Sequence, residues 1–204
     1  SKDGLKNDWV NCVLEGKKNN LWIGTRGGLF QYSSNTFTRF GKNEGLKKEN
    51  VSSLCENDDG SLWAGTRGNG VYRFSNGVFK QYALSTGESD SNIYSLYNDK
   101  ENNLWLGSGK CILKFTNGKF IATPTRNESG FPFRLVRAIR EDKNRTLWVG
   151  TFNSGLTRIT KNDTTTFSNE KTFPHNRITS LFEDAEGTMW IGTYGDGFVR
   201  YKEN

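Results

Sequence analysis

The sequence is poor in several residue types that define common classes of protein. Among its 204 residues it holds one histidine, three prolines and three cysteines, and only 33% are hydrophobic. Three prolines are too few for a proline-rich disordered chain, and no apolar run approaches the roughly 18 residues that span a bilayer. The sequence does not open with a basic segment followed by an apolar stretch, so we expect no signal peptide in it. These shortages favour a folded domain without a membrane segment.

The scarce cysteines and the single histidine predict no metal site and no cofactor. Cys12, Cys55 and Cys111 follow no zinc-binding spacing, and their odd number argues against a full disulfide framework. We expect them to be buried, apolar thiols in strands. His175 lies alone in the loop "TFPHNRI", with no motif that would make it a catalytic base, so we expect an ordinary surface residue there.

The charge of the chain constrains its partners only weakly. Its 28 Lys and Arg residues outnumber its 22 Asp and Glu residues, which gives a net charge of +6. The two signs are interspersed without a basic block, so we expect no nucleic-acid partner. An ordinary charged surface explains the excess, and attraction to an anionic partner such as an acidic glycan is the alternative.

One phrase occurs five times: "LWIGT", "LWAGT", "LWLGS", "LWVGT" and "MWIGT". Its tryptophans follow one another at intervals of 41 to 43 residues, and Trp9 stands outside the series. A small residue lies ten positions before each of them. The repeated tryptophans are Trp22, Trp63, Trp105, Trp148 and Trp190, and the small residues are Cys12, Ser53, Ser95, Ala138 and Ser180. Such a period is typical of propeller blades.

Each repeat divides into four strand-like runs. In the second copy these are "VSSLCE", "SLWAGT", "GVYRF" and "GVFKQY", rich in Val, Tyr, Phe and Trp and bounded by Gly, Asn and Asp. The sequence therefore predicts an all-β protein, a β-propeller of four-stranded antiparallel blades with five repeats. Each repeated tryptophan is expected to pack between adjacent blades, where its burial contributes about 4–6 kcal/mol. The small residue is expected where the innermost strands crowd around the axis.

We expect blades at residues 6–41, 47–83, 89–124, 132–168 and 174–204, the last without its fourth strand. The opening "KDGLKNDWV" aligns with "NEGLKKENV", which joins two blades, so the chain begins inside such a connection. We expect a part of a longer array, able to self-associate through open blade edges. It can close as five blades, stay open or complete itself by oligomerising. A small five-bladed protein with a truncated last blade is the alternative.

With the phrase "D-G-x-L-W-x-G-T-x-x-G-G-[LV]-[YF]-R-[YF]" assembled, nearly the whole chain resembles the two-component regulator propeller family. "ENDDGSLWAGTRGNGVYRF" is among the nearest copies, and "GSGKCILKF" in the third repeat is degenerate. The resemblance implies a periplasmic sensor part of a hybrid two-component kinase, with seven-bladed propellers and oligosaccharides as signals. This chain departs from that pattern, since it has five repeats and no immunoglobulin-like domain, membrane helix or kinase.

A second resemblance is to the Asp box of sialidase-like propellers, in which Asp58, Gly60 and Ser61 precede Trp63. In those proteins the Asp box is a structural turn. The arginine triad and tyrosine nucleophile of sialidases cannot be assembled at matching positions. We therefore expect no enzyme.

The binding candidates follow the Gly-Thr pair of each repeat. Loops between the second and third strands and loops between blades share one face of a propeller, and the residue after Gly-Thr varies between copies. It is cationic or aromatic in four of them, and such groups can stack on sugars and bind their hydroxyl or acid groups. The candidates are Arg26, Arg67, Phe152 and Tyr194, with Asn153, Asp196 and Trp9 in the same neighbourhood. Ordinary exposed turn residues are the alternative.

These features favour a non-enzymatic, ligand-sensing propeller that responds to oligosaccharides and lies in the periplasm. The alternative is a free-standing lectin-like module or protein-interaction scaffold. A propeller enzyme is the least favoured reading.

Overall fold

The computed structural model describes residues 5, 9–17, 19–47, 49–85, 91–123, 135–167 and 176–202. This part of the chain forms nineteen strands and one short 3-10 turn, Lys42–Glu44. The first two blades contain β1 (Val10–Gly16), β2 (Asn20–Thr25), β3 (Gly28–Ser33), β4 (Thr36–Phe40), β5 (Val51–Glu56), β6 (Leu62–Thr66), β7 (Val71–Ser75) and β8 (Val78–Tyr82). The third contains β9 (Ile93–Asn98), β10 (Leu104–Ser108), β11 (Ile112–Thr116) and β12 (Lys119–Ala122). The last two contain β13 (Val136–Glu141), β14 (Leu147–Thr151), β15 (Leu156–Ile159), β16 (Thr164–Phe167), β17 (Ile178–Glu183), β18 (Met189–Thr193) and β19 (Phe198–Tyr201).

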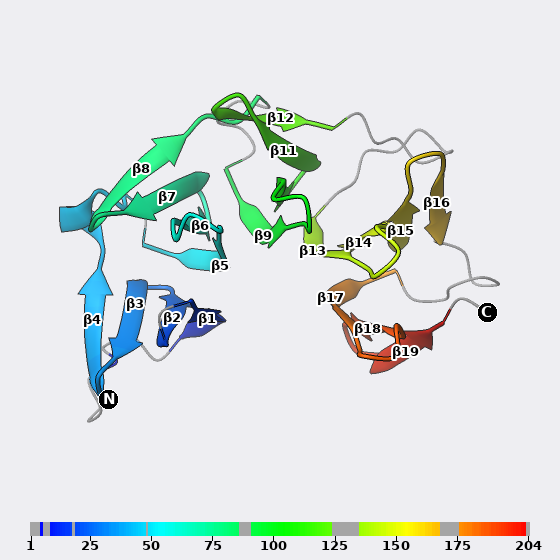
Figure 1. Cartoon of the computed structure of the whole chain (residues 1–204), viewed down its shortest axis with the longest axis horizontal. Coiled ribbons are helices and arrows are strands. Elements are labelled where there is room, and N and C mark those ends of the chain that lie inside the picture. The colour runs from blue at the N-terminus through cyan, green and yellow to red at the C-terminus, as the bar shows by residue number, and fades with distance from the viewer. Residues whose placement is uncertain are drawn as a thin grey trace.

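Consecutive strands pair antiparallel within each blade, giving four sheets of four strands and a last sheet of three, β17-β18-β19. The predicted fold class is therefore confirmed, including the missing fourth strand of the fifth blade. The blades lie around an arc with β1, β5, β9, β13 and β17 on its inner side, and the described parts of the first and last blades do not meet (Figure 1). No helix among the described residues is long and apolar enough to cross a membrane. The predicted blade limits stay a prediction.

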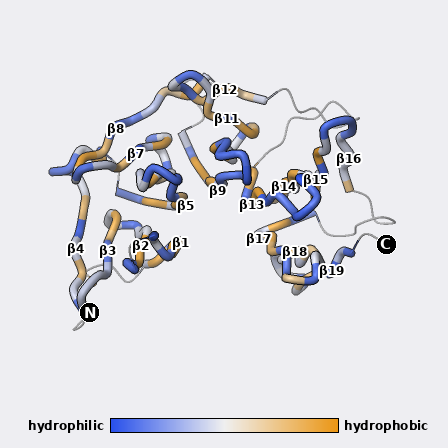
Figure 2. Tube along the Cα trace, viewed as in Figure 1, coloured by the Kyte–Doolittle hydropathy of each residue, from blue (hydrophilic) through white to orange (hydrophobic). Residues whose placement is uncertain are grey.

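The hairpin turns follow from their sequences. Asn76 and Gly77 between β7 and β8 have φ angles of 50° and 78°, and Asn117 and Gly118 between β11 and β12 have 50° and 79°. Two successive left-handed residues make the tight turn that matches the twist of paired strands, and Asn-Gly adopts it at little cost. Figure 2 shows the apolar residues gathered along the strands, with hydrophilic turns.

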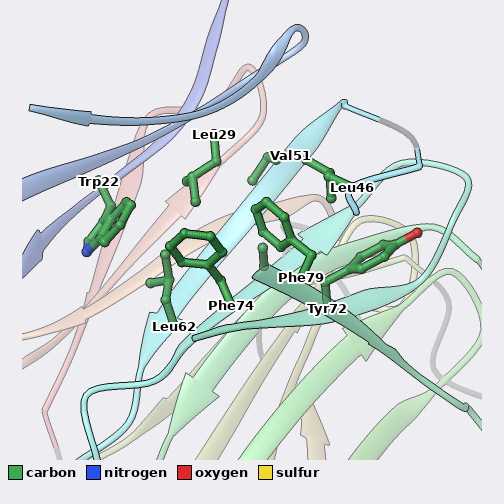
Figure 3. Close-up of a cluster of buried hydrophobic side chains, with 9 residues drawn as sticks. Trp22, Leu29, Leu46, Val51, Leu62, Tyr72, Phe74 and Phe79 are labelled. Atoms are coloured by element: carbon green, nitrogen blue, oxygen red, sulfur yellow. The ribbon is translucent and has the colours of Figure 1, made fainter. Parts of the chain in front are cut away.

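The core lies between blades, and Figure 3 shows the boundary of the first and second. Trp22 from β2 meets Phe74 from β7 edge to face, with ring centroids 5.7 Å apart. Leu62 and Val51 of the second blade belong to the same buried cluster. The sheets are thus held by side chains that cross from one blade to the next.

The other repeated tryptophans occupy corresponding positions. Trp63 packs against Phe115 and Phe120 of the third blade. Trp148 packs against a tyrosine of the fifth blade, with centroids 5.1 Å apart, and Trp105 lies against the cluster between the third and fourth blades. Trp190 is only half-buried, and its ring contacts Phe198 of its own blade.

The small residues pair across the first two strands with the repeated glycines. Ser53 lies opposite Gly65, and a Cβ on Gly65 would come within 2.4 Å of Ser53 Oγ and 2.5 Å of Ile93 Cγ2 in the next blade. Gly107 is equally enclosed by Ser95 and Val136. The structure thus gives a reason other than crowding at the central axis. The pair must be small because the next blade packs directly onto it.

Two of the three cysteines lie in inner strands, Cys12 in β1 and Cys55 in β5. Burial raises the pKa of Cys12 to about 12 and that of Cys55 to about 11, so both stay protonated near neutral pH. Cys111 is half-buried and immediately precedes β11. None of the three cysteines forms a disulfide bond with another described residue.

Three blades tie their tryptophan to the preceding turn by a charged hydrogen bond. The indole N–H of Trp105 donates to Asp99 Oδ2 at 2.8 Å, and the same bond joins Trp148 to Asp142 and Trp190 to Asp184. Burial alone would raise the pKa of Asp99, but hydrogen bonds from Trp105 and the 101–103 turn outweigh it and hold that pKa below 3.8. The turn is therefore linked directly to the tryptophan ring on the second strand of the same blade.

We predict that Trp63→Ala lowers the free energy of unfolding by about 3–5 kcal/mol, because its cavity opens between two blades. Trp63 is 1% exposed. Trp190→Ala, at the half-buried end of the arc, is the matched control and should cost clearly less. Chemical denaturation followed by fluorescence measures both. Equal losses would contradict the inter-blade role of the ring.

Asp99→Asn should remove an acid-dependent part of the stability. Because the pKa of folded Asp99 lies below its ordinary value of 3.8, the contribution is complete above that value and is lost as pH falls through the folded pKa. The unmodified chain should therefore lose more stability on acidification below about pH 5 than the variant does. Thermal unfolding across pH measures this, with Glu101→Gln on the same turn as control. Identical pH profiles for all three proteins would refute the prediction.

Candidate functional site

Two kinds of loop meet at one end of the inner strands. The backbone N–H of the residue after each Gly-Thr pair donates to the carbonyl of the residue just before the inner strand. The bonds are Arg26 to Trp9 (3.1 Å), Arg67 to Asn50 (2.9 Å), Phe152 to Leu135 (3.1 Å) and Tyr194 to Arg177 (2.9 Å). The second-to-third-strand turn and the inter-blade connection are therefore fastened together in each of these blades.

Every inner strand has a β-bulge one residue before its small residue. The register shifts between Val51 and Ser53 in the second blade and at the same place in the other four. A bulged residue leaves the regular hydrogen-bonded pairing of the two strands, and its side chain is re-aimed. The bulged residues are Asn11, Ser52, Tyr94, Arg137 and Thr179.

Cations and aromatic rings alternate along this end of the later blades. The guanidinium of Arg67 lies 3.8 Å from the ring centre of Tyr94, and that of Arg137 lies 4.7 Å from the same ring. Arg137 also lies 5.2 Å from the ring centre of Phe152, and Arg177 lies 5.7 Å from it. Cation–aromatic contacts at such distances are attractive.

A third ring completes the series, since Phe152 and Tyr194 meet edge to face with centroids 5.4 Å apart. We name the whole series the cation–aromatic ladder. It consists of Arg67, Tyr94, Arg137, Phe152, Arg177 and Tyr194. Its members come from four consecutive blades, so the ladder exists only because the sheets stand side by side.

Two adjoining hollows open beside the ladder. One, of about 510 Å³, is lined by Arg137, Phe152, Arg177, Thr179 and Tyr194. The other, of about 410 Å³, shares Arg177 and Tyr194 and adds Asn176, Gly195 and Asp196. A third hollow near β8 is lined by residues such as Asn69 and Gln81, and none of its described lining residues is charged. The first two therefore combine concave shape with charged and aromatic groups.

Positive charge is concentrated here. Arg67, Arg137 and Arg177 belong to none of the ion pairs formed among the described residues. Burial lowers the pKa of Arg67, and the neighbouring Arg137 lowers it further, while Tyr94 opposes both. Asp196 is the single acid among the residues that line the two hollows.

The structure brings some predicted site residues together and separates others. Arg67, Phe152 and Tyr194 join the ladder, and Asp196 lines the second hollow. Asn153 is exposed on the turn after Phe152 and lines neither hollow.

Trp9 and Arg26 form a separate pair on the first blade, with the guanidinium 3.6 Å from the ring centre. Sequence reasoning missed Tyr94, Arg137 and Arg177. A signal existed for Tyr94 and Arg137, because the position before each small residue varies between copies, whereas Arg177 stands three positions before its small residue, Ser180.

The described residues contain no group of three or more His, Cys, Asp or Glu side chains that could hold a metal ion. His175 lies outside the described residues. The ladder offers guanidinium donors, ring faces and two tyrosine hydroxyl groups, which are groups that bind and orient a ligand.

Antiparallel blades that repeat around an arc, with variable loops at one end of the inner strands, define a β-propeller repeat protein. Five segments match the two component regulator propeller family, at residues 4–27, 45–68, 87–110, 130–153 and 172–195. These segments make up more than half of the chain, which therefore belongs to that family. A search of curated proteins gives no match.

Solved structures share the fold. The extracellular domain of a hybrid two component system from B. thetaiotaomicron is 23% identical, with a TM-score of 0.77 over 100% of this chain and 28% of that chain. Virginiamycin B lyase from Staphylococcus aureus is 18% identical, with a TM-score of 0.73 over 97% of this chain and 71% of that one. This chain thus spans little more than a quarter of the first protein. Because one of these proteins is an enzyme, the likeness establishes the fold alone.

Proposed function

We propose that this chain is a non-enzymatic sensing propeller from the extracytoplasmic, periplasmic part of a two-component regulatory protein, and that it binds an oligosaccharide at the cation–aromatic ladder. The observation that carries the proposal is the open hollow of about 510 Å³ that is lined by two guanidinium groups and two aromatic rings. Family membership and the likeness to an extracellular domain of a two component system support the sensing role.

The chemistry of the hollow suits a sugar. Its volume lies within the roughly 300–1,000 Å³ of small-molecule sites. The faces of Phe152 and Tyr194 can cover the apolar face of a sugar ring, and Arg137, Arg177 and Thr179 supply donors for its oxygens. The described residues that line this hollow carry guanidinium, hydroxyl and aromatic groups, which suit the recognition of a ligand.

We expect titration calorimetry with neutral and acidic oligosaccharides to reveal binding that Phe152→Ala and Tyr194→Ala each weaken at least about tenfold, or about 1.4 kcal/mol. Trp9→Ala removes an exposed ring of the first blade and serves as control. Absence of binding to the whole panel would overturn the proposal. A loss caused by Trp9→Ala alone would move the site to the first blade.

The two ends of the arc favour a second role, as an interaction surface for another copy of the chain. Phe198 of β19 is 70% exposed, whereas Val71 at the same place in the second blade is fully buried against the third. Val13 of β1 is 56% exposed, whereas its counterpart Leu54 packs against the first blade. We propose that the last blade of one copy binds the first blade of a second, as neighbours do within the chain.

Light scattering should then show a mass that rises with concentration, and Phe198→Asp should keep the chain monomeric. Val78→Asp is the matched control, because Val78 is 60% exposed on an outer strand away from both end faces. A monomer at every concentration, or equal effects of the two variants, would contradict self-association through the end faces.

A further inference from the structure

Three guanidinium groups of the cation–aromatic ladder converge around two of its aromatic rings. Arg137 stands between the rings of Tyr94 and Phe152, within 5.2 Å of both ring centres. Arg67 lies on the first ring and Arg177 on the second. Arg67 and Arg137 are close enough for the charge of Arg137 to lower the pKa of Arg67, and apolar surroundings such as the rings screen like charges poorly.

Three other arginines of the described chain, Arg39, Arg73 and Arg145, form ion pairs with acidic side chains. Arg39 pairs with Glu49 at 2.5 Å, and Arg73 pairs with Asp59 at the same distance. The three ladder arginines form no such pair with a described residue. The cation–aromatic ladder thus brings together three arginines that form no ion pair with a described acidic side chain.

Burial adds to the cost of holding these arginines charged. Arg67 is half-buried, and both its burial and the nearness of Arg137 lower its pKa. A bound anion would oppose the effects of burial and of Arg137 on the pKa of Arg67, because it supplies a countercharge and accepts hydrogen bonds from the guanidinium groups.

We infer that the ladder selects anionic saccharides, with the acid group seated between Arg137 and Arg177 while the sugar ring lies against Phe152. This inference rests on the proposed oligosaccharide function and specifies its ligand class. Arg137 and Arg177 both line the same hollow and flank the same ring, so one acid group can meet two planar, charged donors.

The neighbouring hollow fixes the direction of the ligand. Asp196 lines that hollow, whereas the described residues that line the first hollow include two arginines and no acid. The acid group therefore points toward Arg137, and neutral hydroxyl groups face Asp196. A carboxylate and a sulfate ester share the same chemistry toward guanidinium, so both are candidate acid groups.

The test compares ligands that differ only in the acid group. Calorimetry would use trigalacturonate, the neutral galactotriose and a sulfated galactotriose, each at low and high salt, with inorganic sulfate as a fourth probe. We expect at least tenfold tighter binding of an acidic trisaccharide than of galactotriose, with a preference that shrinks as salt screens the charges. The stronger of the two acidic trisaccharides identifies the acid group.

Variants assign the preference to residues. Arg137→Gln and Arg177→Gln should each abolish the acidic preference, because they weaken the acidic trisaccharides more than galactotriose. Arg177 is exposed, so its variant disturbs no core packing. Arg26→Gln, the arginine paired with Trp9 on the first blade, should leave the preference unchanged.

The outcomes separate the two proposals. Equal affinities for galactotriose and the acidic trisaccharides would overturn the anionic selection and leave the oligosaccharide function standing. Binding of none of the three trisaccharides would overturn both. Inorganic sulfate binding as tightly as the acidic trisaccharides would show an anion site without sugar recognition and would also overturn the inference.

Discussion

The structure depends on one contact, made four times, in which an indole ring on the second strand of a blade packs against the sheet that follows. No blade of four short strands has enough apolar surface to be stable alone, so each sheet relies on its neighbour for cover. The glycine opposite Ser53 shows how close that cover is, since one added carbon would overlap both Ser53 and Ile93. Where the neighbour is absent, at Phe198, the same surface lies open.

This packing leaves a few positions free, and the candidate site is built from them. The inner strand must keep its small residue and its flanking apolar residues. The bulged residue between them, however, leaves the regular pairing of the strands, so its side chain is re-aimed. The residue after Gly-Thr is fixed by its backbone bond, so its side chain is also unconstrained. Tyr94, Arg137 and Phe152 occupy such positions. Variation there changes the mouth without weakening the blades.

The fold could be predicted from the sequence because its signals are local and repeated. Tryptophans at intervals of 41 to 43 residues and Asn-Gly turns require no knowledge of distant contacts. The site could be predicted only in part. Arg67 and Phe152 stand next to the repeated phrase, whereas the bulge that presents Arg137 arises from strand register. Which cation meets which ring depends on the angle between blades, which the sequence does not state.

The ladder's position along the arc has a physical cause in these same bulges. In the first blade, Asn11 donates to the carbonyl of Val51 at 2.7 Å, and in the second, Ser52 donates to the carbonyl of Ile93 at 2.6 Å. Both side chains are thus used to fasten one blade to the next. From the third blade onward the bulge carries Tyr94, Arg137 and Thr179, and the first two of these contact rings and cations of the mouth instead. Recognition therefore lies toward the later blades, because in the earlier ones the same position serves the scaffold.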